Sequence, residues 1–213
     1  MSQRTLKLQA KKFEEIERIK PYKKRLAGIQ YTVLPKVYSG GTDTALLCST
    51  MDIKKGETLW DIGTGTGLVA LKAKTKGASY VLATDQSPYA VRNVRLNSKA
   101  LGIKVDVKTA DVFGNIHKRF DVVTFNPPFT DHQALKDYQV CFWDRGNLAT
   151  KTFFRELHNH LTPEGCAFIC WSSFGTRNLL KGLAKQNHLK IEHKKRRRGS
   201  HSLYYDVYKL TPV

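Results

Sequence analysis

Residues 58–67 read TLWDIGTGTG, a short apolar run that passes directly into three glycines at alternate positions. The length and β-branched content of the run predict a buried strand over residues 58–62. Glycine permits backbone conformations and a close ligand approach that a Cβ atom would block. A glycine turn at the end of a strand can cradle a nucleotide, so we expect a strand, a binding turn and a helix in that order.

Two classes of cofactor compete for this turn. The dinucleotide fingerprint is G-x-G-x-x-G, but after Gly63 and Gly65 its third glycine position holds Leu68, which counts against NAD. The strand also carries Asp61, whose carboxylate would repel a pyrophosphate and attract a cation. S-adenosylmethionine carries a sulfonium and an ammonium, so the loop from Asp61 to Gly67 favours it. A glycine turn that only connects a strand to a helix is the alternative.

Length and composition indicate one well-buried domain, since the chain has 213 residues of which 41% are hydrophobic. No apolar run approaches the roughly 18 residues of a membrane helix, and the charged N-terminus predicts no signal peptide. The four cysteines form no CxxC pair and the histidines lack metal-ligand spacing, so we expect a reducing, cytoplasmic setting and no metal site.

The positive charge is concentrated at the two ends of the chain. The formal net charge is +18, and residues 1–36 hold ten basic and three acidic side chains, while residues 185–198 hold seven and one. We therefore divide the chain into a basic N-terminal extension, residues 1–36, with an amphipathic helix expected over 6–20, and a main domain, residues 37–213. Basic ends around a neutral centre predict a polyanion binder, and a merely soluble basic surface is the alternative.

Further candidate residues follow the elements next to the glycine turn. Thr42 is the expected N-cap of a helix reaching residue 51, and Asp43 follows it in a segment that either lies over the cofactor or is a plain linker. A second strand, residues 80–84, ends on Asp85, 24 residues past Asp61, close to the interval at which a carboxylate meets ribose hydroxyls. A surface aspartate is the alternative there. Asp111, after a third strand over 105–109, could accept from an adenine amino group.

The fourth strand, residues 120–125, runs straight into NPPF at residues 126–129. Two prolines lock an extended turn, which leaves the Pro127 carbonyl free beside the amide oxygen of Asn126. Two such acceptors suit a planar amine, because accepting both N–H bonds helps localise its lone pair for attack on a sulfonium methyl. Phe129 could stack on the same planar group. As a bare tetrapeptide NPPF is often only a turn, but its place after strand four favours the catalytic interpretation.

These segments together resemble the class I S-adenosylmethionine-dependent methyltransferases of the small-domain type, from about Val37 to the C-terminus. The resemblance is carried by DIGTGTG at 61–67, ATDQSPYAVRNVRLN at 83–97, Asp111 and FDVVTFNPPF at 120–129. It implies a Rossmann-like α/β fold whose seven-stranded, mostly parallel sheet has helices on both faces and an antiparallel last strand. We expect residues 194–198, KKRRR, to form an exposed turn between the last two strands, at 189–193 and 203–210.

Family members with NPPF or NPPY act on planar nitrogens, so the resemblance implies N-methyl transfer. The chain is similar both to ribosomal RNA base methyltransferases and to HemK-type glutamine methyltransferases. The segment TDTALL at 42–47 resembles the cofactor lid of the HemK type. Phe129 departs from the usual tyrosine of the HemK branch. We expect an RNA base, adenine N6 or guanine N2, as acceptor, and a glutamine amide of a release factor or ribosomal protein as the alternative. An RNA-binding protein that has lost catalysis is a third interpretation. The oligomeric state stays open.

Overall fold

The computed structural model describes residues 13–14, 16–17, 20–173, 175–176, 178–199 and 203–213. Most of the helix predicted over residues 6–20 lies outside these residues. Within the described part of the chain, helices that combine the length and the apolar character needed to cross a bilayer are absent.

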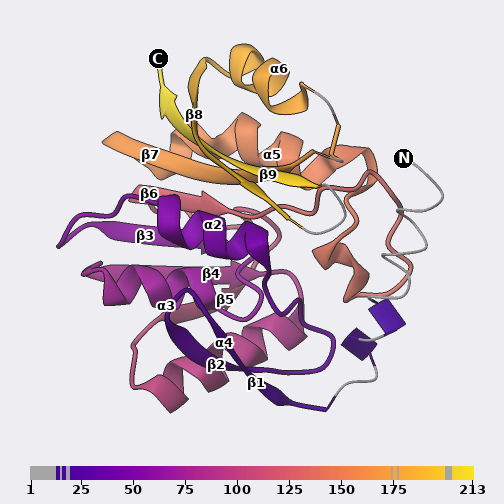
Figure 1. The fold of residues 1–213 in the computed structure, drawn as a ribbon. Helices are drawn as coiled ribbons and strands as arrows, with labels where there is room; N and C mark the ends of the chain where they lie inside the picture. Colours follow the sequence, from indigo (N-terminus) through magenta and orange to yellow (C-terminus); the bar gives the residue numbers. More distant parts are fainter. Residues whose placement is uncertain (1–12, 15, 18–19, 174, 177, 200–202) are drawn as a thin grey trace.

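A seven-stranded sheet in the order β5-β4-β3-β6-β7-β9-β8 is the centre of the fold (Figure 1). Neighbouring strands are parallel from β5 to β7, while β9 is antiparallel to both β7 and β8. This confirms the predicted sheet with its antiparallel last strand. The strands are β3 (Thr58–Ile62), β4 (Tyr80–Asp85), β5 (Asp106–Thr109), β6 (Phe120–Phe125), β7 (Leu161–Ser172), β8 (Leu189–Arg198) and β9 (Tyr204–Pro212).

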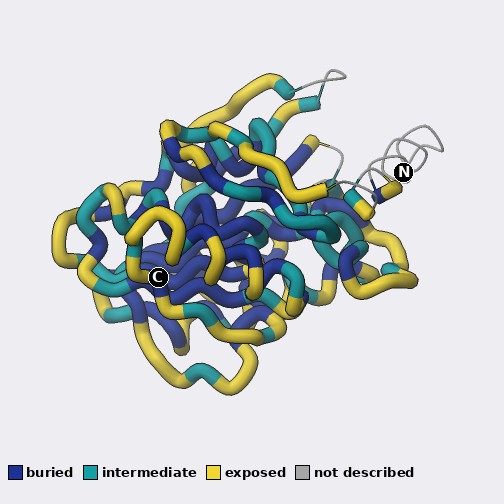
Figure 2. The backbone as a smooth tube through the Cα atoms, turned by 90° about the horizontal axis from the view of Figure 1, so that it is seen from below, coloured by how far each residue is buried: buried dark blue, intermediate teal, exposed yellow. Residues whose placement is uncertain are grey.

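Helices pack around this sheet and cover its hydrophobic core. They are α2 (Thr42–Thr50), α3 (Leu68–Thr75), α4 (Pro88–Leu101), α5 (Leu148–Glu156) and α6 (Leu179–Gln186). Figure 2 shows buried backbone through the middle of the molecule and exposed backbone mainly in the connections. Trp60 of β3 is fully buried there, and its indole N–H donates to the Thr84 hydroxyl at 2.9 Å, so this large ring is buried without an unpaired donor.

A hairpin of β1 (Tyr22–Leu26) and β2 (Ile29–Val33) precedes the sheet. The Tyr, Val and Ile residues at 29–33 predict a short strand there, whereas β1 is not predicted. Successive side chains of β2 point to opposite faces of the strand, and one face buries Ile29, Tyr31 and Val33 in the common hydrophobic core. Two asparagines of α4, Asn93 and Asn97, donate to the Thr32 carbonyl at 2.8 and 2.9 Å. This part of residues 1–36 therefore packs on the rest of the protein, and a functional division at residue 36 stays a proposal.

Three sequence predictions need correction. Residues 194–198 belong to the edge strand β8 rather than to a turn, because they pair with β9 after a bulge and their charged side chains remain in solvent. The hydrophobic pattern over residues 148–161 predicts one helix, but α5 ends at Glu156, since Leu157–His160 tighten into a 3₁₀ turn and Leu161 is already extended against Phe120. Gly41, not Thr42, caps α2; a Cβ there would lie 2.8 Å from the Tyr38 hydroxyl.

Candidate active site

A cavity of about 390 Å³ lies at the edge of the sheet where β3, β4 and β6 end. Parallel strands deliver their carboxyl ends to one edge, so residues far apart in the sequence meet there. Six of the predicted residues line the cavity: Asp61, Gly63, Gly65, Asp85, Asp111 and Asn126. The other five, Thr42, Asp43, Gly67, Pro127 and Phe129, are not among its lining residues.

The glycine turn has the backbone geometry that its sequence predicts. Gly63 and Gly65 have φ values of 61° and 58°, a left-handed conformation that side chains rarely adopt. Gly67, at φ 84°, caps α3, and a Cβ there would lie 2.9 Å from a methyl group of Val94. Gly63 and Gly65 thus shape the cavity wall, whereas Gly67 lets the start of α3 approach Val94 of α4.

Asp61 is buried beneath this turn. Thr64 donates its hydroxyl hydrogen to one carboxylate oxygen at 2.6 Å, and Thr124 donates to the other at 2.8 Å. Burial nevertheless raises the pKa of Asp61 to about 7, because its charged form has lost most of its hydration. A cation in the cavity would favour the ionised form.

Asp85 is joined to the backbone on both sides of its carboxylate. Its Oδ2 accepts from the Gly65 N–H and its Oδ1 from the Ser87 N–H, both at 2.9 Å. Burial raises the pKa of Asp85, and these two hydrogen bonds oppose that shift. Asp111, by contrast, is exposed at the rim of the cavity.

Asn126 belongs to a buried polar network that the sequence did not reveal. Its Nδ2 donates to Asp43 Oδ2 at 2.8 Å and lies 3.4 Å from the Thr44 hydroxyl oxygen, while Tyr38 donates its hydroxyl hydrogen to Asp43 Oδ1 at 2.9 Å. Burial and the neighbouring Asp43 raise the pKa of Tyr38 well above its ordinary value. The Asn126 Oδ1 atom is buried and has no hydrogen-bond partner among the described residues.

The two other residues of the NPPF catalytic prediction, Pro127 and Phe129, are not among the residues that line the cavity. Pro127 is buried, and Phe129 is 9% exposed. The Phe129 ring packs edge-on against Trp171, with centroids 5.8 Å apart, and lies 6.0 Å from the ring of Tyr205. The structure therefore brings Asn126 to the cavity and places Phe129 in the packing behind it.

A rim segment, residues 131–147, closes one side of the cavity and was missed by the sequence analysis. It contributes Tyr138, Cys141, Trp143 and Arg145 to the lining. The aromatic-rich stretch YQVCFW at 138–143 was the available signal. Its charged ends, by contrast, resemble an ordinary loop.

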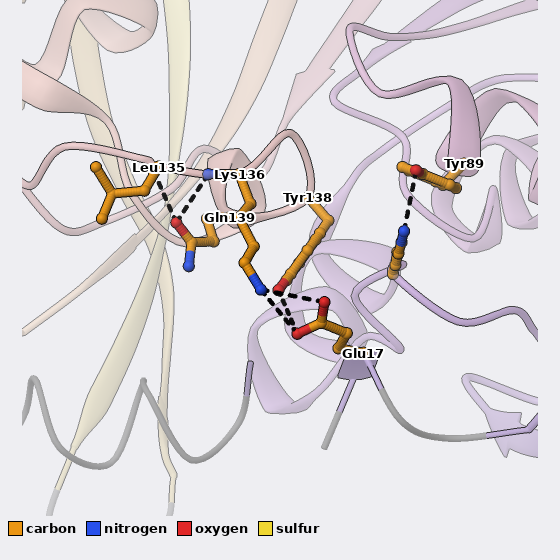
Figure 3. Close-up of polar contacts among 7 residues, drawn as sticks. Glu17, Tyr89, Leu135, Lys136, Tyr138 and Gln139 are labelled. Carbon is orange, nitrogen blue, oxygen red and sulfur yellow. Dashed lines mark hydrogen bonds and ion pairs between the residues drawn. The ribbon is translucent and has the colours of Figure 1, made fainter. Parts of the chain in front are cut away.

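The described N-terminal residues hold this rim segment in place (Figure 3). Glu17 accepts hydrogen bonds from the Tyr138 hydroxyl at 2.8 Å and from the Lys136 ammonium at 3.1 Å. Phe13 is only 4% exposed, and its ring centroid lies 4.7 Å from that of Trp143 and 5.1 Å from that of Phe142. The described N-terminal residues thus support the rim segment from behind, although neither Phe13 nor Glu17 is among the residues that line the cavity.

The cavity has the chemistry of a site for a polar, positively charged ligand. Carboxylates of Asp61, Asp85 and Asp111 lie along it. Two buried polar atoms of lining residues, Asn126 Oδ1 and Ser87 Oγ, have no hydrogen-bond partner among the described residues. A bound donor would satisfy the first of them, and a sulfonium and an ammonium would complement the carboxylates. These residues fit S-adenosylmethionine.

The fold and this site define an S-adenosylmethionine-dependent methyltransferase. The chain belongs to the methyltransferase small domain family, whose model matches residues 29–196. The predicted cofactor and enzyme class are thereby confirmed.

Three similar proteins show how far the similarity extends. A protein of Methanocaldococcus jannaschii, named provisionally as a protein N5-glutamine methyltransferase, is 30% identical over 70% of this chain and 78% of its own length. Ribosomal RNA small subunit methyltransferase C of Photorhabdus laumondii is 31% identical over 66% of this chain and 40% of its own. The T. thermophilus 16S rRNA guanosine N2-methyltransferase, solved with S-adenosylmethionine and guanosine, has a TM-score of 0.71 at 21% identity, covering 91% of this chain and 50% of that one.

Proposed function

We propose that the protein transfers a methyl group to the exocyclic amine of an RNA base, adenine N6 or guanine N2. The observation that carries this proposal is the unpartnered Asn126 Oδ1, a buried acceptor on a residue that lines the cavity. A buried acceptor without a partner is costly unless a ligand donates to it. An amine N–H is such a donor.

The chain's own residues would orient the acceptor. Asn126 Oδ1 and the Pro127 carbonyl would accept the two N–H bonds of the amine and so localise its lone pair. S-adenosylmethionine supplies the electrophilic methyl group. The methylated nitrogen becomes more acidic as its bond to carbon forms, so water can take the proton afterwards and no separate general base is needed. Phe129, packed against Trp171 and Tyr205, would support the NPPF turn.

The remaining predicted residues would hold the cofactor. Asp85 would accept from the ribose hydroxyls, Asp111 from the adenine amino group, and the turn at Gly63, Gly65 and Gly67 would allow close approach. Asp61 would stabilise the positive charge of the methionine portion. Thr42, at the start of α2, would cover the cofactor.

An RNA acceptor is supported by where the basic residues lie. Ser172 at the end of β7 pairs with Tyr205, which pairs with Arg197, so the basic end of β8 lies at the same sheet edge as the end of β6. Three strand spacings of about 4.8 Å separate β8 from β6, or about 14 Å in all. Phosphates flanking an inserted base could reach that distance.

A glutamine amide in a translation protein is the second candidate, favoured by the similarity to the M. jannaschii protein. The same acceptors would hold an amide nitrogen. A cytoplasmic location also stays a proposal, suggested by the free thiols of all four cysteines.

The two acceptors are distinguished by labelling. The purified chain and S-adenosylmethionine carrying a radioactive methyl group are incubated with an extract of a strain that lacks the gene. We expect label in RNA that ribonuclease releases, and a methylated adenosine or guanosine missing from the deletion strain by nucleoside mass spectrometry. Label in a protein band that survives ribonuclease would overturn the RNA assignment and support glutamine.

A further inference from the structure

We propose that Asp43 is a positioning residue that fixes which end of the Asn126 amide faces the cavity, and that it thereby makes the site select an acceptor bearing N–H groups. This inference rests on the proposed function and extends it to a residue outside the cavity lining. It replaces the sequence interpretation of Asp43 as a residue that touches the cofactor.

Asp43 and Asn126 are distant in the sequence but adjacent in the fold. Asp43 lies in the first turn of α2 and is 3% exposed, and Asn126 follows β6, 83 positions later in the chain. Each oxygen of the Asp43 carboxylate already receives a hydrogen bond, one from the Tyr38 hydroxyl at 2.9 Å and one from Asn126 Nδ2 at 2.8 Å. Two donors thus hold this carboxylate in place.

The carboxylate determines the orientation of the amide because the two ends of an amide have the same shape but opposite hydrogen-bonding character. An ionised carboxylate only accepts hydrogen bonds, so it requires the NH₂ group of Asn126 to face it. A flipped amide would place two acceptor oxygens at 2.8 Å in a buried setting. The Thr44 hydroxyl, 3.4 Å from the same nitrogen, can donate or accept and therefore does not impose an orientation.

The consequence is a fixed acceptor oxygen at the reaction centre. With Nδ2 bound to Asp43, Oδ1 must point the other way, and it is the buried atom that has no partner among the described residues. Such an atom binds an amine or amide N–H and disfavours a carbonyl, a carboxylate or another lone-pair acceptor in the same place. Asp43 therefore contributes to the choice of nitrogen over oxygen as the methylated atom.

An exchange of the two side chains tests this role. Asp43→Asn leaves an amide at position 43 that can present either end to Asn126. Asn126→Asp places two carboxylates next to each other. Each of these single variants should lower kcat at least about tenfold. In the double variant the amide at 43 can donate to the carboxylate at 126 and accept from Tyr38, so kcat should recover to within about threefold of wild type. The cofactor Kd of Asp43→Asn should stay within about twofold of wild type, and the melting temperature of the double variant should match wild type.

A second measurement needs no substrate. In a ¹H–¹⁵N spectrum of the protein saturated with S-adenosylmethionine, the side-chain amide of Asn126 is identified by its loss in Asn126→Asp. We expect one shifted, slowly exchanging proton in wild type, its loss in Asp43→Asn, and its retention in the control Thr44→Val.

The outcomes separate the inference from the function it rests on. An unchanged Asn126 amide signal in Asp43→Asn, or a double variant no faster than either single variant, would overturn the role of Asp43 and leave the proposed function intact. Methylation of an oxygen rather than a nitrogen by wild type would overturn the proposed function and the selection, even where the amide signal behaves as expected.

Discussion

The Gly65 N–H donates a hydrogen bond of 2.9 Å to Asp85 Oδ2, so the glycine turn after β3 is tied to the end of the neighbouring strand β4. The second oxygen of the same carboxylate accepts from the Ser87 N–H at the start of α4. Asp85 thus connects the turn after one strand to the helix after the next. A carboxylate held on both sides is well placed to meet a ligand in one orientation.

Asp85→Ala should therefore weaken S-adenosylmethionine binding by about 1.5 to 3 kcal/mol, the scale of hydrogen bonds to a charged acceptor. Loss of the Gly65 contact adds to the loss of the ribose contacts, so the effect should exceed that of a residue touching the ligand alone. Calorimetry measures the change, with Asp106→Ala, an exposed aspartate at the start of β5, as the control. Equal cofactor affinity in Asp85→Ala and wild type would remove Asp85 from the site.

Asn126→Ala should lower turnover while leaving cofactor affinity nearly intact. The hydrogen bonds that Asn126 accepts are expected to strengthen as the amine becomes a nucleophile. Their loss should therefore raise the free energy of the transition state more than that of the bound substrate. The expected decrease in kcat is about 10²-fold, and single-turnover assays at saturating cofactor measure it. Wild-type turnover in this variant would refute the assignment of Asn126.

Cofactor binding should depend on pH through Asp61. Its pKa is raised from 3.8 to about 7, so the ligand-free protein binds this proton near neutrality, while a bound cation favours the ionised form. S-adenosylmethionine affinity should therefore rise between about pH 6 and 8, with release of a proton. The binding enthalpies in two buffers of different ionisation enthalpy give the number of protons released. Asp61→Asn should abolish the pH dependence; if the dependence persists, another group causes it.

The same shift in pKa predicts the pH dependence of stability. Because the folded chain holds the Asp61 proton more tightly than the unfolded chain, this group makes the free energy of unfolding decrease from about pH 4 to about pH 7 and stay level above. Asp61→Asn should flatten that slope in denaturant titrations of the ligand-free protein. A wild-type slope in the variant would contradict the raised pKa.

Phe13→Ala should loosen the rim segment without unfolding the sheet. Phe13 fills the space between Tyr138, Phe142 and Trp143, and removing a buried ring deletes those contacts. Hydrogen exchange of residues 138–143 should accelerate while that of β3 does not change. Glu17→Gln, which alters an exposed polar contact, should have a much smaller effect. Equal protection of the rim in Phe13→Ala and wild type would show that the ring does not hold it.

Much of the fold could be predicted because local patterns specify it. The apolar run at 58–62 and the glycines after it determine a strand, a turn and a helix start within ten residues. The same holds for α4, because a serine followed by a proline, Ser87 and Pro88, is a typical helix start and begins this helix. Once parallel strands are assigned, topology brings Asp61, Asp85 and Asn126 to one edge.

The remaining features depend on contacts between distant residues. No local pattern pairs Asp43 with Asn126, or Glu17 with Tyr138, since each pair is separated by more than eighty residues. Phe129 resembles a substrate-stacking ring in the sequence, but its surroundings, Trp171 and Tyr205, come from β7 and β9. The basic run at 194–198 resembles a turn because its strand pairing depends on β9, further along the chain.

RNA binding should depend on the basic end of β8 more than on the catalytic pocket. Each phosphate neutralised by a lysine or arginine releases counterions, so affinity should fall steeply with salt. Arg196 holds Asp206 through two hydrogen bonds of 2.8 and 3.1 Å and is best retained, so that the variant tests charge rather than folding. The test variant replaces four exposed residues with glutamine: Lys194, Lys195, Arg197 and Arg198.

This variant should weaken binding to structured RNA roughly equally for all sequences and flatten the plot of log affinity against log salt concentration. Its control removes the same charge from exposed lysines near the opposite, amino edge of the sheet: Lys54, Lys55, Lys99 and Lys104. Since those lysines lie away from the edge where Asn126 is found, the control should keep most of the affinity and slope, as should Asn126→Ala. Fluorescence anisotropy at several salt concentrations measures all three variants. Equal losses in the β8 variant and the control would mean that net charge alone attracts RNA, and the β8 edge would then have no special part in presenting the base.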